Sequence, residues 1–100
     1  MILLVPMDCD DTQEASLVKI ADAKQWATIE IEEGQVVEIN FYKTRESVEA
    51  WLDAVVVEND YEPVMPFIEE QMMVLVAHTQ RSIDDIVEAY LFRELHQLAL

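Results

Sequence analysis

Three short runs of apolar residues without alternation dominate the hydrophobic pattern of this chain. They span residues 2–5, 54–57 and 72–77, and each leads into polar positions. Unbroken apolar runs of this length are typical of strands that are covered on both faces, as in a parallel sheet. Pro6 has no N–H with which to extend a ladder, so the first strand is predicted to end near Met7. Right-handed crossovers then place the three strands side by side, in the same direction, at the centre of one sheet.

Two further strands are indicated by alternating apolar and polar residues at 26–32 and 37–42. The only glycine of the chain, Gly34, lies between them, where a hairpin turn needs a left-handed residue. The pattern therefore predicts an antiparallel hairpin at one edge of the sheet, with one face buried and the other acidic.

Helical spacing of apolar residues predicts three helices. The first is capped by Thr44, and the second is short and begins near Pro66, since proline is tolerated at the start of a helix. Ser82 caps the last helix, whose apolar residues continue at i, i+3, i+4 spacing to Leu98. The larger side chains in these apolar patterns, which we expect in the core, are Trp26, Trp51, Met72 and Met73.

The order of these elements predicts one mixed α/β domain over residues 1–100. Its sheet has five strands, and the helices pack on the faces of the sheet. A chain of 100 residues with 52% apolar residues is long and apolar enough to bury a core of this kind.

The charge balance narrows the classes of partner. Asp and Glu number 21 against six Lys and Arg, which gives a formal net charge of −15. Phosphate backbones and anionic lipid surfaces bind proteins through basic residues, so this chain is expected to bind neither nucleic acid nor membranes. Its partners should be basic, neutral or metal-containing.

A single cysteine, Cys9, excludes an internal disulfide. The opening apolar run is too short for a signal peptide, and no stretch approaches the roughly 18 apolar residues of a membrane span. We therefore expect a cytoplasmic protein.

Four strings in this order resemble the dinitrogenase iron–molybdenum cofactor biosynthesis family, of the NifX and NifB C-terminal type. They lie at residues 2–6, 29–36, 53–57 and 83–91, and the last is the most family-like. The resemblance implies a ribonuclease H-like fold with a mixed five-stranded sheet. It also implies a non-catalytic domain that binds or carries an iron–sulfur or iron–molybdenum cluster, with a cluster-assembly or acceptor protein as its partner. The alternative is a diverged scaffold that serves only protein interaction, and a homodimer is also open.

Cys9 and His78 are the candidate cluster ligands. Each follows the carboxyl end of a predicted central strand, where ligands bind in open parallel sheets. Thiolate and imidazole are ligands of iron, zinc and clusters, and two protein ligands make an open or shared site. The family's His-Phe-Gly-Arg signature falls on residues 19–22, which read Lys-Ile-Ala-Asp. The alternative, without a bound ligand, is that Cys9 is a small half-buried apolar residue and that His78 is an ordinary loop residue.

Carboxylates should crowd the same edge of the sheet. The candidate metal ligands among them are Asp8, Asp10, Glu58 and Asp60. Carboxylates at such strand ends hold two metals in ribonuclease H-like nucleases, so a two-metal phosphodiesterase is a second hypothesis. The net charge opposes it, because no basic surface guides a phosphate backbone. Two other hypotheses remain. These oxygens could bind a hard cation such as Mg²⁺ or Ca²⁺, or they could form an acidic edge that is only solvated.

Overall fold

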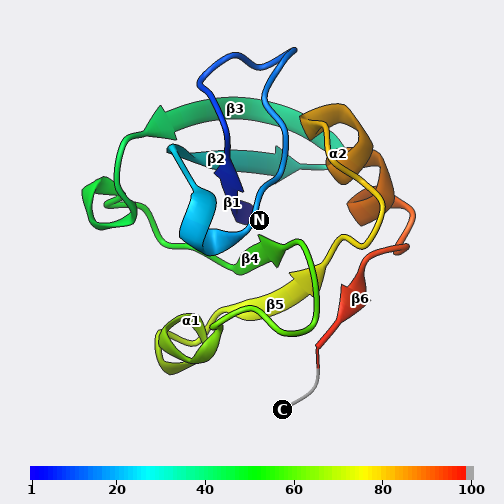
Figure 1. Ribbon diagram of the computed structural model, residues 1–100. Coiled ribbons are helices and arrows are strands. Elements are labelled where there is room, and N and C mark those ends of the chain that lie inside the picture. Colours follow the sequence, from blue (N-terminus) through cyan, green and yellow to red (C-terminus); the bar gives the residue numbers. More distant parts are fainter. Residues whose placement is uncertain (99–100) are drawn as a thin grey trace.

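The computed structural model describes residues 1–98, which form one six-stranded sheet with helices against it (Figure 1). The strand order is β3-β2-β1-β4-β5-β6. The strands are β1 (Ile2–Met7), β2 (Gln25–Glu32), β3 (Gln35–Tyr42), β4 (Ala54–Val57), β5 (Met73–Val76) and β6 (His96–Gln97). The helices are α1 (Met65–Glu69) and α2 (Ile83–Leu91), with 3₁₀ turns η1 (Ile20–Asp22) and η2 (Arg45–Ser47). The predicted mixed α/β fold is confirmed, but five strands is wrong.

The three central strands run as predicted. β1 pairs in parallel with β4, and β4 pairs in parallel with β5. Every residue of β4 is buried, and β1 is buried from Leu3 to Met7. Strands enclosed on both faces need apolar side chains at every position, which explains the unalternating runs in the sequence.

The hairpin of β2 and β3 is also confirmed, at the β3 edge of the sheet. Glu33 and Gly34 both have positive φ, of 52° and 77°, as the central residues of a type I′ turn require. Val37 was predicted on the buried face of the hairpin, and this prediction is wrong. A β-bulge shifts the register, so that Ile31 pairs with Val36 and Glu30 pairs with Glu38, which leaves Val37 without a partner in β2. Val37 is consequently 53% exposed.

The last helix is capped as predicted but is shorter. The Ser82 hydroxyl accepts a hydrogen bond from the Asp85 N–H at 3.0 Å. The helix ends at Leu91, and Arg93 takes a left-handed φ of 58° that reverses the chain. Leu98, predicted on this helix, instead donates its N–H to the Val74 carbonyl at 2.9 Å, beside the short sixth strand. The missed strand is the reason for the wrong strand count.

The helix predicted after Thr44 is wrong. Only the 3₁₀ turn η2 forms, and the Thr44 hydroxyl bonds the Ser47 hydroxyl rather than a backbone N–H. The chain then extends toward β4, and the Asp53 N–H donates to the Ile2 carbonyl at 3.0 Å. Trp51, expected in the core, lies on this extended segment and is 90% exposed.

Two apolar clusters lie on the two faces of the sheet. Leu3 and Val5 pack with Ile83 and Ile86 of α2, whereas Leu4 packs on the opposite face, where α1 contributes Phe67. The predicted helices on both faces are therefore confirmed, as is the short helix near Pro66, which begins at Met65. Trp26 and Met72 are buried as expected, but Met73 is exposed.

Within residues 1–98, no helix has the length and apolar character needed to cross a membrane.

The two tryptophans should differ sharply in their contribution to stability. Trp26 is 7% exposed, and its ring lies 6.1 Å from that of Phe67. Trp26→Ala is expected to cost about 3–5 kcal/mol of unfolding free energy, because it leaves a cavity in the core. Trp51→Ala should stay within about 0.5 kcal/mol. Urea denaturation measures both, and similar losses in the two variants would contradict the fold described here.

Candidate functional site

The candidate site lies at the edge of the sheet where β1, β4 and β5 end. Because these strands are parallel, their carboxyl ends open at one edge. The six predicted site residues follow these strands: Asp8, Cys9 and Asp10 after β1, Glu58 and Asp60 after β4, and His78 after β5. We call this edge the exit rim.

Among the six predicted site residues, His78 and Asp60 form a direct contact with each other. His78 Nε2 lies 2.8 Å from Asp60 Oδ1, and the two side chains are 55% and 42% exposed. A carboxylate on one ring nitrogen orients the imidazole, as in many metal-binding histidines. Nδ1 is then the ring nitrogen that can approach a metal.

Two neighbours of His78 were missed by sequence reasoning. The His96 ring lies 6.3 Å from the His78 ring, between centroids, because β6 returns along β5. The Arg81 guanidinium donates to the carbonyls of Ala77, Gln80 and His78 at 2.9, 2.9 and 3.1 Å. Arg81 thus fixes the backbone from which His78 projects. Neither role was visible in the pattern, since one needs the sixth strand and the other a specific loop conformation.

Cys9 is half-buried and packs against the apolar cluster on the α2 face of the sheet. This placement agrees with the alternative interpretation, in which Cys9 is a small apolar residue and not a ligand. None of the interactions described for residues 1–98 joins Cys9 to His78. Within the same residues, no three His, Cys, Asp or Glu side chains are grouped to hold a metal ion.

The carboxylates of the exit rim have different surroundings. Asp8 closes the loop after β1: its Oδ1 accepts the Ser16 N–H at 2.9 Å, and its own N–H donates to the Ser16 carbonyl at 3.1 Å. Asp10 is exposed and Glu58 is half-buried. Two of the four predicted metal-binding carboxylates, Asp8 and Asp60, are therefore engaged in hydrogen bonds within the protein.

Substitutions at Asp8 and Asp10 test whether the Asp8 carboxylate stabilises its loop. Asp8 accepts a hydrogen bond from the loop backbone, whereas Asp10 is exposed and serves as the control. Asp8→Ala removes the acceptor of the Ser16 N–H and should cost about 1 kcal/mol of unfolding free energy. It should also speed hydrogen exchange at the Ser16 amide. Asp8→Asn retains an acceptor oxygen and should largely restore protection, whereas Asp10→Ala should leave both measurements unchanged. Equal effects of Asp8→Ala and Asp10→Ala would exclude this role for Asp8.

No family model matches this sequence, and no curated protein matches it significantly. The chain resembles several solved structures in fold, among them the following two. A candidate dinitrogenase from Methanocaldococcus jannaschii has a TM-score of 0.78 and 15% identity, with 99% of this chain and 95% of that chain covered. The protein PH0822 has a TM-score of 0.75 and 12% identity, with 98% and 96% covered. At these identities the likeness shows a shared mixed α/β fold over nearly the whole chain.

Proposed function

We propose that this chain is a diverged member of the dinitrogenase iron–molybdenum cofactor biosynthesis family, with the ribonuclease H-like fold of that family. In this proposal it is a non-catalytic carrier whose cargo is an iron–sulfur or iron–molybdenum cluster. The observation that carries the proposal is the exit rim, where the ends of three parallel strands meet and Asp60 orients His78. The likeness in fold to a candidate dinitrogenase over 99% of the chain supports the family.

Cys9 and His78 would supply the protein ligands of the cargo. A thiolate and an imidazole suit iron in such clusters. Two ligands leave most positions of a cluster to other donors, which the delivering or accepting protein can provide. Incomplete coordination suits a carrier, because the cargo must be released as well as bound. Cys9 is half-buried, so part of this residue is accessible at the exit rim.

The charge of the chain fits this role better than the nuclease alternative. A formal charge of −15 repels nucleic acid and anionic membranes, so the proposed partners are cluster-assembly or acceptor proteins. A reducing cytoplasm would keep the single thiol free for its cargo.

Anaerobic reconstitution with ferrous iron and sulfide tests the proposal. The wild-type protein should gain visible thiolate-to-iron charge-transfer absorbance and retain iron through gel filtration. Cys9→Ser should lose both signals, and His78→Asn should weaken them, because each removes one ligand. Glu32→Gln, an exposed change on the hairpin, serves as the control and should match the wild type.

If the wild-type protein stays colourless and binds no iron, the carrier function is rejected. The remaining hypothesis is then a scaffold that serves only protein interaction. Full absorbance in Cys9→Ser would reject Cys9 as a ligand.

A further inference from the structure

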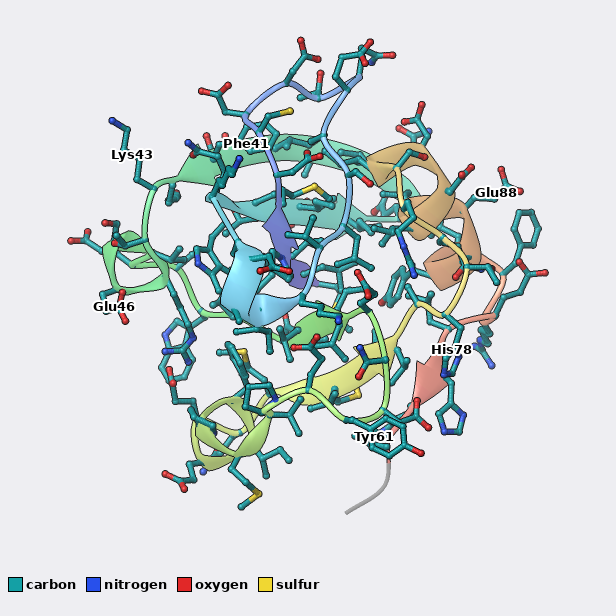
Figure 2. All side chains as sticks on the ribbon, viewed as in Figure 1. Phe41, Lys43, Glu46, Tyr61, His78 and Glu88 are labelled. Carbon is teal, nitrogen blue, oxygen red and sulfur yellow. The ribbon has the colours of Figure 1, made fainter. Side chains whose placement is uncertain are left out.

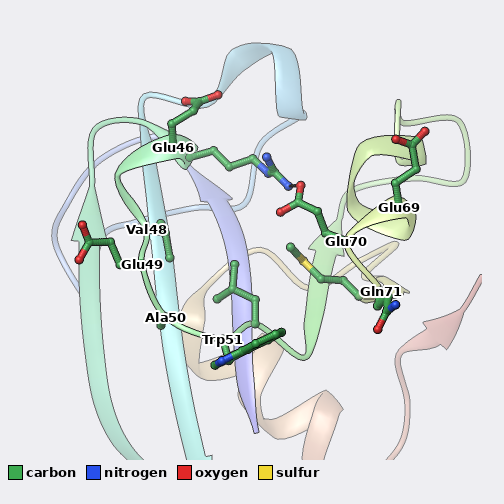
Figure 3. A pocket seen from close by; sticks show the side chains of 11 residues that line it. Glu46, Val48, Glu49, Ala50, Trp51, Glu69, Glu70 and Gln71 are labelled. Atoms are coloured by element: carbon green, nitrogen blue, oxygen red, sulfur yellow. Dashed lines mark hydrogen bonds and ion pairs between the residues drawn. The ribbon is translucent and has the colours of Figure 1, made fainter.

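A groove outside the exit rim opens at the amino ends of β4 and β5 (Figure 3). It has a volume of about 710 Å³ and lies between the segment after the hairpin and the end of α1. Glu46, Glu49 and Trp51 line it from the first segment, and Glu69 and Glu70 from the second. We call it the Trp51 groove.

Trp51 is the most unusual residue of this groove. Its side chain is 90% exposed, whereas the other tryptophan of the chain is 7% exposed. A large apolar ring held in water is unfavourable, and tryptophan is enriched among the residues that dominate protein interfaces. Beside a groove with an apolar floor, this ring is available for contact with another molecule.

The floor of the groove is apolar. Met72 is buried, and the half-buried Val48 and Leu52 pack against the same apolar cluster beneath α1. An apolar side chain that entered the groove would therefore meet a continuation of the core.

The walls of the groove are acidic on both sides. Arg45 spans the groove to form an ion pair with Glu70, and its guanidinium lies 4.3 Å from the centroid of the Phe67 ring. Glu46, Glu49 and Glu69 form no ion pair within residues 1–98. The lining has four carboxylates and one guanidinium, a formal charge of −3, so complementarity requires a basic occupant.

We propose that the Trp51 groove docks a segment of a partner protein in which Lys or Arg stands beside an apolar residue. The apolar side chain lies on Val48 and Leu52. The cation stacks on the Trp51 indole, a favourable cation–π arrangement, and pairs with the unpaired glutamates. The charge of −15 on the whole chain steers such a partner toward the protein.

The groove and the exit rim lie at opposite ends of the central strands. β4 has four residues, which span about 13 Å at roughly 3.3 Å per residue. A docked segment that stays within the groove therefore leaves the carboxyl ends of the strands open. The inference does not depend on the proposed cargo, because the groove is formed by other residues.

A short synthetic peptide of alternating arginine and leucine is the probe. Titration followed by NMR should shift the Trp51 indole N–H signal and leave that of Trp26 in place. Trp51→Ala should weaken binding about tenfold, as expected for loss of a cation–π contact with its apolar area. The double variant Glu49→Gln with Glu69→Gln should also weaken binding and reduce its salt dependence. Tyr61→Ala removes an aromatic ring that is 94% exposed outside the groove, and it should bind as the wild type does.

Wild-type affinity in both the Trp51→Ala and the double glutamate variants would overturn the proposal. So would shifts centred on Asp60 and His78, or equal weakening in Tyr61→Ala, because either result means general attraction to an acidic protein. A peptide with glutamate in place of arginine should not bind, and binding by that peptide would also reject the charge complementarity.

Discussion

The parallel pairing of β1 with β4 and of β4 with β5 is the constraint on which the rest of this structure depends. These strands have apolar side chains on both faces, and helices or loops must cover each face to remove them from water. Parallel direction also sorts the connections, since all chain segments leaving the strands gather at one edge and all segments reaching them gather at the other. In Figure 2, His78 and Tyr61 lie on loops at the periphery of the molecule. The side chains of β4, by contrast, are apolar and fully buried.

This sorting gives the domain two chemically different ends. The exit rim collects the thiol, an imidazole and carboxylates, whereas the opposite end collects Trp51, glutamates and an apolar floor. The loops of the exit rim are tied by local hydrogen bonds, with Asp8 closing one loop and Arg81 closing another. These hydrogen bonds fix the backbone of the loops, while side chains such as His78 and Asp60 stay partly exposed.

The central strands, the hairpin and the Ser82 cap could be predicted because each has a local signal. An unbroken β-branched run, a Gly34 turn and a capping hydroxyl each specify nearby backbone geometry. The exit rim followed from those strands by topology alone. The sequence could therefore predict that Asp60 and His78 lie at the same edge of the sheet. It could not predict that they form a hydrogen bond with each other.

The errors arose where long-range pairing overrides local pattern. Leu95 and Leu98 continue the helical spacing, but the chain turns at the left-handed Arg93 and His96–Gln97 pair with the edge of β5. This pairing also brings His96 beside His78. Trp51 has helical spacing with Val48, but the bond from Asp53 to Ile2 extends the segment toward the sheet. In both segments the pairing partner is far away in the sequence, β5 for His96 and Gln97 and β1 for Asp53, and no short window of sequence contains that partner. Trp51 lies on the extended segment that leads into β4, where its ring is exposed, and the same segment forms one wall of the Trp51 groove.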